Sequence, residues 1–187
     1  QLIGVEPRQA EFDEAGHLIK LNLAGLNLGA LPPEIGEFTQ LEVLILGRIF
    51  DNQDQETEPW NLNELGNALT ALPPEIIKLT YLRILICENN QLINLPPNFS
   101  KLVNLQILVL NRNQLSSLPP DFAQLVNLKE LWLGNNQLSS LPSDFARLVD
   151  LQKLALHTNQ LSNLPPDFAQ LVNLKELYLA GNQLSSL

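Results

Sequence analysis

The chain of 187 residues repeats itself, and this repetition constrains its fold more than any other feature. The dipeptide Leu-Pro recurs at 23-residue intervals, at Leu72, Leu95, Leu118, Leu141 and Leu164. The segments 118–140 and 164–186 are identical at 20 of 23 positions. An earlier Leu-Pro, at Leu31, lies 41 residues before Leu72, so this interval holds 18 residues more than one period. Such a period predicts a solenoid of stacked repeats.

Each period follows the pattern LxxLxLxxNxLxxLPxxFxxLxx. The LxL part predicts a short strand, because its leucines alternate with outward-pointing residues. The PPDFAQL part carries proline where the first turn of a short helix or 3₁₀ turn tolerates it. One such unit cannot bury its own leucines. We therefore expect successive units to stack into a parallel β-sheet with a continuous core.

Two further residue types recur once per repeat. An asparagine follows each strand, where a buried carboxamide can satisfy backbone groups that have left the sheet. We predict that these side chains form a buried ladder, made of Asn67, Asn90, Asn113, Asn136, Asn159 and Asn182. An aromatic or aliphatic residue in the return segment is expected to fill the convex side of the core, at Ile35, Ile76, Phe99, Phe122, Phe145 and Phe168.

These motifs, over residues 18–187, resemble the leucine-rich repeat family. The LPPEIG and LPPDF openings are similar to the 23-residue class of bacterial repeat proteins, to Ras-group intracellular scaffolds and to the repeat segments of Roco proteins. The resemblance implies an α/β solenoid: a right-handed horseshoe with its parallel sheet on the concave side, short helical or 3₁₀ returns on the convex side, and partners bound on the concave face. Two positions depart from the pattern. Leu26 replaces the first asparagine, which suits an N-terminal capping repeat, and Cys87 replaces a core leucine as a small hydrophobe.

The pattern also suggests a domain organisation. We interpret residues 1–17 as an N-terminal flank or cap and residues 18–187 as about seven repeats of a longer protein, because the array ends in mid-motif. The 18 additional residues lie within 48–66 and form an insertion directly after a strand. Long loops on rigid scaffolds often carry function, and a neutral insertion explains the segment equally well. The candidate contact residues of this insertion are Phe50, Asp54, Glu56 and Trp60.

Alternation along each strand predicts which residues point outward on the concave face. One column runs Asn22, Ile45, Ile86, Val109, Trp132, Ala155 and Tyr178, and the column before it runs Lys20, Val43, Ile84, Ile107, Glu130, Lys153 and Glu176. Repeats two to four should therefore expose one contiguous aliphatic patch. Strand propensity is the alternative explanation for these β-branched residues. Further along, Trp132 and Tyr178 are expected to flank a slot above Ala155. Its polar rim is predicted to consist of Glu88, Asn111, Arg112 and His157.

We predict from these features a scaffold for protein–protein interaction that binds a protein or peptide on its concave face. One alternative is a binder of carbohydrate or small ligands that uses Trp132 and Tyr178. Another is self-association as a homodimer, within a multidomain signalling protein such as a Roco GTPase.

Composition argues against several other function classes. A net charge of −9 disfavours nucleic acid and anionic membrane as partners. The two histidines, His17 and His157, lie many repeats apart, and no phosphate-binding, nucleophile or zinc motif is present. We therefore expect no enzyme activity, no metal site and no cofactor. The single cysteine leaves no disulfide framework or disulfide caps, which favours a cytoplasmic location.

Overall fold

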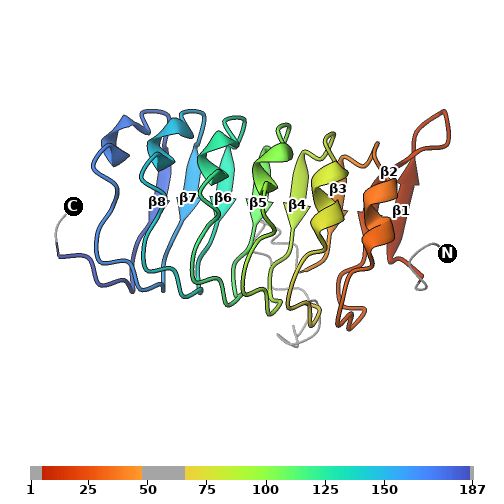
Figure 1. Cartoon of the computed structure of the whole chain (residues 1–187), viewed down its shortest axis with the longest axis horizontal. Coiled ribbons are helices and arrows are strands. Elements are labelled where there is room, and N and C mark those ends of the chain that lie inside the picture. The colour runs from red at the N-terminus through yellow and green to blue at the C-terminus, as the bar shows by residue number, and fades with distance from the viewer. Residues whose placement is uncertain (1–5, 48–65, 186–187) are drawn as a thin grey trace, which may run out of the picture.

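The computed structural model describes residues 6–47 and 66–185, in which one mixed sheet runs the length of the molecule (Figure 1). Its eight strands lie side by side in sequence order. The strands are β1 (Gln9–Phe12), β2 (Leu18–Asn22), β3 (Val43–Ile45), β4 (Ile84–Ile86), β5 (Ile107–Val109), β6 (Glu130–Trp132), β7 (Lys153–Ala155) and β8 (Glu176–Tyr178). β2 to β8 are parallel, as the repeat pattern predicts, whereas β1 is antiparallel to β2 and comes from the segment before the repeats.

The parallel strands pair without any shift in register. The central leucine of each strand faces the central leucine of the next, as Leu108 faces Leu131 and Leu131 faces Leu154. Neighbouring strands in a sheet lie about 4.8 Å apart. Outward residues at equivalent positions of successive repeats are therefore direct neighbours, and each forms a continuous column across the sheet face.

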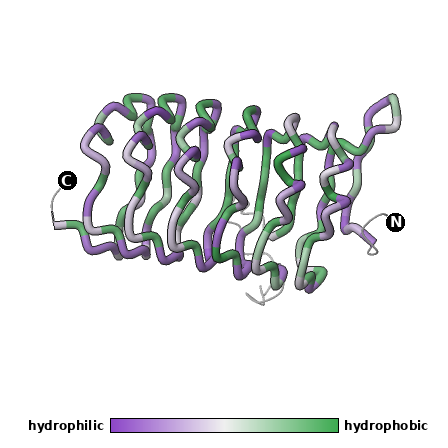
Figure 2. Tube along the Cα trace, in the orientation of Figure 1, coloured by the Kyte–Doolittle hydropathy of each residue, from purple (hydrophilic) through white to green (hydrophobic). Residues whose placement is uncertain are grey.

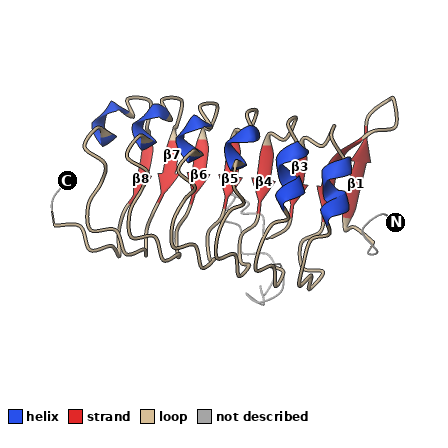
Figure 3. Cartoon of the chain, in the orientation of Figure 1, coloured by secondary structure: helices blue, strands red, loops and turns tan. Residues whose placement is uncertain are grey.

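The return segments form 3₁₀ helices on the side opposite the sheet (Figure 3). They are η1 (Pro33–Glu37), η2 (Pro74–Lys78), η3 (Phe99–Lys101), η4 (Phe122–Gln124), η5 (Phe145–Arg147) and η6 (Phe168–Gln170). Segments of three to five residues are too short to pay for an α-helical nucleus, and a proline opens η1 and η2. The predicted short helical or 3₁₀ returns are therefore present as 3₁₀ helices.

The core lies between the sheet and the 3₁₀ helices, and apolar stretches recur in every coil (Figure 2). Phe99, Phe122 and Phe145 are fully buried, and the rings of Phe99 and Phe122 stack with centroids 6.5 Å apart. Phe168, in the last coil, is half-buried and stacks on Phe145 at 6.4 Å. Cys87 is also buried among the leucines.

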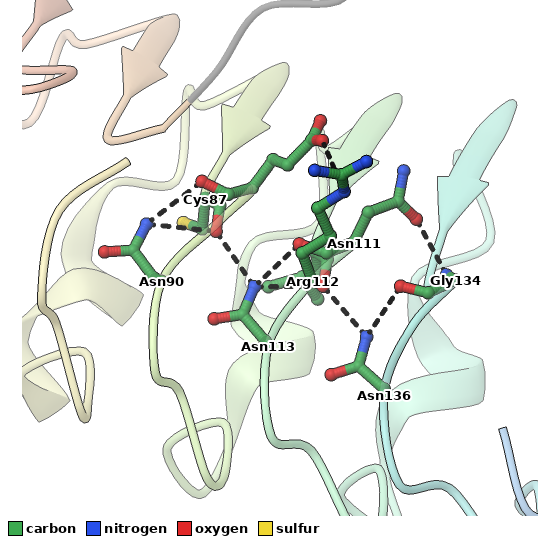
Figure 4. A network of polar contacts seen from close by, with 9 residues as sticks. Cys87, Asn90, Asn111, Arg112, Asn113, Gly134 and Asn136 are labelled. Atoms are coloured by element: carbon green, nitrogen blue, oxygen red, sulfur yellow. Dashed lines mark hydrogen bonds and ion pairs between the residues drawn. The ribbon is translucent and has the colours of Figure 1, made fainter. Parts of the chain in front are cut away.

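The asparagines after the strands connect successive coils through their carboxamides (Figure 4). Nδ2 of Asn136 donates to the carbonyls of Leu110 and Leu133 at 3.0 Å, and its Oδ1 accepts from the amide of Leu115 at 3.0 Å. Equivalent bonds are made by Asn90, Asn113, Asn159 and Asn182, the last of which is half-buried. Each carboxamide therefore holds the backbone of its own coil against the preceding one.

Asn67 extends this bonding to the first repeat, where Leu26 replaces the asparagine. Its Nδ2 donates to the carbonyls of Leu23 and Leu46 at 2.9 and 2.8 Å. Its Oδ1 accepts from the amides of Leu26 and Leu28 at 3.1 and 3.0 Å. The first coil thus obtains its side-chain bonds from an asparagine that lies beyond the insertion in sequence.

The residue directly before each ladder asparagine from Asn90 to Asn182 adopts a left-handed backbone conformation. Asn89 and Asn135 have φ of 57° and 55°, which asparagine tolerates, and Gly181 has φ of 72°. Arg112 and Thr158 occupy the same position with φ of 54°. A left-handed conformation is costly for most L-residues and most of all for β-branched ones, so Thr158 is strained.

Substitution of Asn136 with alanine should lower the free energy of unfolding by about 1–3 kcal/mol, because it leaves buried backbone groups without partners. Urea unfolding followed by circular dichroism measures this loss. Asn163 is exposed and bonds only to the neighbouring Ser162 hydroxyl, so Asn163→Ala is the matched control and should stay within about 0.5 kcal/mol of wild type. Equal effects of the two substitutions would contradict the role given to the ladder.

Thr158→Asn should increase the free energy of unfolding by about 1 kcal/mol, because asparagine adopts the left-handed conformation at lower cost. Asn135→Thr, the reverse change one repeat earlier, should destabilise the protein by a similar amount. Both are measured in the same urea titrations. A destabilising Thr158→Asn would show that the threonine side chain contributes more than the backbone strain costs.

Candidate functional site

The sheet face carries an aliphatic patch over β3, β4 and β5. The patch consists of Val43, Ile84, Ile86, Ile107 and Val109, which are half-buried and adjacent through the strand register. The prediction that Ile45 is exposed with them is wrong, since only 3% of its surface is accessible. Ile45 lies between Asn22 and Ile86 on the neighbouring strands, and alternation along a strand gives the direction of a side chain but not how much of it is covered.

Beyond the patch, the two aromatic residues of the same column stack on each other. The ring centroids of Trp132 and Tyr178 lie 6.2 Å apart with an interplanar angle of 26°. The predicted slot between them is therefore closed, and Ala155 beneath them is 1% exposed. Strands two apart are separated by about 10 Å, a gap that two aromatic side chains can bridge by leaning together. Stacking favours this arrangement over two separate rings in water.

A row of charged residues holds both rings by their polar atoms. Trp132 Nε1 donates to Glu130 Oε2 at 3.2 Å, and the hydroxyl of Tyr178 donates to Glu176 Oε2 at 3.0 Å. Lys153 Nζ lies 3.6 Å from a carboxylate oxygen of each glutamate. Alternation along the strands predicts the outward direction of these three residues but not their role. One sequence feature could have shown this role. The charges alternate from repeat to repeat at the position two residues before the aromatic column, and both positions lie on the same face.

The pKa of the Tyr178 hydroxyl is raised above its ordinary value. The hydrogen bond to Glu176 is the main cause, and the negative charge of that carboxylate and partial desolvation act in the same direction. Lys153 opposes them by favouring the phenolate. The neutral hydroxyl, which is the donor to Glu176, is therefore the form that this environment favours.

The strand-end side of the sheet face differs from the predicted polar rim. Glu88 and Asn111 are buried, at 0% and 4% exposure, rather than standing at the rim. Arg112 is exposed, and its Nε lies 4.0 Å from Glu88 Oε1. Asn111 Oδ1 accepts from the Gly134 amide at 2.7 Å (Figure 4). Periodicity alone did not show that the side chains of Glu88 and Asn111 are buried or that Asn111 bonds to the backbone of the next coil.

His157 lies over Gly134. A Cβ at Gly134 would come within 2.2 Å of the imidazole Nε2, so only glycine leaves room for the ring in this position. His157 is half-buried, and its Nδ1 lies 3.5 Å from the hydroxyl of Thr158. The structure thus places His157 against the coil of Gly134, which lies next to the coil of Asn111 and Arg112.

Phe50, Asp54, Glu56 and Trp60 lie outside the described residues. Burial raises the pKa of the Cys87 thiol, which keeps it protonated and a weak nucleophile. The described part of the chain contains no group of three or more His, Cys, Asp or Glu side chains suited to a metal ion. None of its helices has the length and apolar character needed to cross a membrane.

The sequence analysis also missed a shallow polar depression of about 290 Å³ near the starts of β6 to β8. It is lined by Lys129, Asp150, Gln152, Asn173 and Lys175. Asn127 and Asn173 each donate to a carbonyl one repeat back, that of Val103 at 2.7 Å and that of Val149 at 2.9 Å. Asp150 holds the equivalent position, where an ionised carboxylate has no N–H to donate. The sequence feature that could have shown this site is the segment LVD at 148–150, because the equivalent segments at 102–104, 125–127 and 171–173 read LVN.

Glu176→Gln should lower the pKa of Tyr178 towards its ordinary value, because it removes the carboxylate that disfavours the phenolate. The measurement is an absorbance titration of the phenolate in a Tyr81→Phe background, which leaves Tyr178 as the sole tyrosine. Glu42→Gln is the control, since Glu42 pairs with Arg83 and leaves the titration unchanged. An unchanged pKa in Glu176→Gln would contradict the hydrogen bond described above.

Comparison with known proteins agrees with this architecture. The family model for the leucine rich repeat matches residues 80–138, 103–161 and 127–184. The structure is similar to that of a leucine-rich repeat protein of Leptospira interrogans, with a TM-score of 0.71 and 34% sequence identity. That match covers 86% of this chain and 36% of the other. No curated protein sequence matches the chain. Since the matched repeats span more than half of its residues, the chain belongs to the leucine-rich repeat family.

Proposed function

We propose that this chain is a protein-interaction module that binds a protein or peptide segment on its sheet face, the concave side of the horseshoe. Leucine-rich repeats are in general scaffolds for protein interaction. The observation that carries the proposal is one continuous apolar surface. It extends from the aliphatic patch on β3 to β5 into the stacked rings of Trp132 and Tyr178.

Strand propensity does not explain this surface completely. It accounts for β-branched residues such as Ile86 and Val109, which suit a strand wherever it lies. It does not account for an aromatic pair whose polar atoms are both bonded to glutamates. Tryptophan and tyrosine often provide much of the binding energy of protein interfaces. Their presence beside a contiguous apolar patch favours a docking surface.

The aromatic pair is also ordered before a partner arrives. Glu130, Glu176 and Lys153 fix the two rings through hydrogen bonds and ion pairs. A partner therefore loses less binding free energy to the ordering of side chains than it would on a mobile surface. The three residues that hold the rings, Glu130, Lys153 and Glu176, carry a net charge of −1. Together with the chain's net charge of −9, this favours a partner with apolar residues next to basic ones.

The carbohydrate alternative is not favoured by the arrangement of the rings. A sugar bound between Trp132 and Tyr178 requires the slot that their stacking closes.

The LPP openings at 23-residue intervals support assignment to the class found in bacterial and Roco proteins. We infer a non-enzymatic role, because the sequence holds no recognisable catalytic motif. We infer a cytoplasmic location from the single cysteine, which leaves no disulfide caps.

Selection of peptides from a random display library on the immobilised chain tests the proposal. Selected peptides should carry apolar residues next to lysine or arginine. Their affinity should fall at least about tenfold on the double variant Ile86→Glu/Val109→Glu, because the substitutions place charge in the aliphatic patch. Fluorescence polarisation gives the dissociation constants, and circular dichroism shows whether the variant is folded.

A double variant of the opposite face, Val126→Glu/Val149→Glu, is the matched control. These valines are 42% and 46% exposed next to the 3₁₀ helices, so binding should be retained. Peptides that bind the sheet-face variant as tightly as wild type would contradict the proposal. Sedimentation velocity on the same proteins distinguishes binding of a peptide partner from self-association of the chain. A dimer of wild type that the sheet-face variant abolishes would make a second copy of the chain the partner.

A further inference from the structure

Two residues at the strand-end side of the sheet face depart from the repeat. The position after the last core leucine of each strand is small in several coils, as in Gly47, Gly134 and Ala180, but is Asn111 after β5. The next position is glycine or asparagine in most coils but is Arg112 here. Since coils with Gly134 and Asn135, or with Ala180 and Gly181, at these two positions adopt the same backbone, the fold does not require either side chain.

The backbone of Arg112 adopts a conformation that suits other residues better. Its φ of 54° suits asparagine, which Asn89 and Asn135 supply at the equivalent positions. Its amide donates to the Gly134 carbonyl at 2.9 Å, a bond that any residue except proline makes there. A residue retained against local preference in a repetitive array is a candidate for function.

Asn111 provides an independent observation. It is 4% exposed, and its Oδ1 is engaged by the Gly134 amide. Its Nδ2 makes no hydrogen bond within the part of the chain that the structure describes. Figure 4 shows this carboxamide and the guanidinium of Arg112 on the same side of the strand ends. The Nδ2 atom reaches solvent, so this N–H group can donate to an acceptor that a ligand supplies.

The guanidinium of Arg112 is positioned beside this donor. Its Nε lies 4.0 Å from Oε1 of the buried Glu88 carboxylate, and 44% of its side chain is exposed. The guanidinium has five N–H donors in a planar fork, of which the Glu88 side uses only part. Glu88 thus orients the group, and the other edge of the fork remains open to an acceptor.

We propose that Asn111 and Arg112 form a subsite that binds a carboxylate of the partner, a conclusion that rests on the proposed function. The planar fork of arginine matches two carboxylate oxygens, and Nδ2 of Asn111 donates to one of them. The buried charge of Glu88 and the net charge of −9 disfavour a doubly charged phosphate. His157, seated over Gly134, bounds the subsite on the side of the next coil.

The test is a titration of the isotope-labelled chain with 4-methylpentanoate, followed by nuclear magnetic resonance. The side-chain amide signals of Asn111 and the Nε–H signal of Arg112 should shift saturably. The uncharged isostere 4-methylpentanamide should shift neither. Arg112→Asn should lower the affinity for the carboxylate at least tenfold. The variant should stay folded, because asparagine suits the left-handed backbone. Arg147→Asn, which removes the same charge from the opposite face, should leave the affinity within twofold.

No saturable shift, equal shifts with the amide, or an unchanged affinity in Arg112→Asn would each overturn the subsite. Two peptides identify the source of the carboxylate: acetyl-Leu-Val-Leu with a free carboxyl end, and acetyl-Leu-Asp-Leu-amide. Tighter binding of the first indicates a chain terminus, and tighter binding of the second an acidic side chain. A carboxylate that binds while the peptide selection yields no sheet-face ligands would retain the subsite and reject the docking surface. The reverse pattern would reject the subsite alone.

Discussion

The asparagine ladder is the interaction on which the rest of the structure depends. Where the chain leaves each strand, the backbone groups lose their sheet partners, and burying them unpaired would be costly. One carboxamide per coil supplies donors and an acceptor to two coils at once, as Asn113 does for Cys87, Leu92 and Leu110. This bonding holds successive coils in the same conformation. The strands therefore pair without register shifts, and outward side chains become columns.

Much of this order is predictable from the sequence, because the period specifies it many times over. The strands, the asparagine positions and the buried phenylalanines each follow from a residue that recurs in every coil. The sheet-face details are less predictable because they depend on neighbours across the sheet. Alternation correctly directs Ile45 and Trp132 outward, but it does not say how far a neighbouring side chain leans. Alternation therefore did not predict the burial of Ile45 or the stacking of Trp132 and Tyr178 over Ala155.

The near identity of the repeats makes departures from them informative. In most folds an arginine in a left-handed conformation cannot be compared with equivalent positions of the same chain, whereas here those positions hold Asn89, Asn135, Thr158 and Gly181. The same comparison singles out Asp150, where neighbouring coils use asparagine to bond the preceding backbone. Each departure loses a favourable feature of the repeat. Arg112 loses the residue type that suits a left-handed backbone, and Asp150 loses the amide that donates to the preceding coil. Arg112 and Asp150 do so on opposite sides of the strands, so they do not form one site.

The two sides of the apolar surface therefore present different chemistry to a partner. On the strand-start side, Glu130 and Glu176 share the single positive charge of Lys153. On the strand-end side, Arg112 and the unpaired Nδ2 of Asn111 are donors. An apolar surface alone would accept a segment in either direction, because burial of apolar area has no orientation. Charges of opposite character on its two sides penalise the reversed pose, since like charges then face each other. The fold supplies the surface, and the few residues that break its repeat supply the direction of binding.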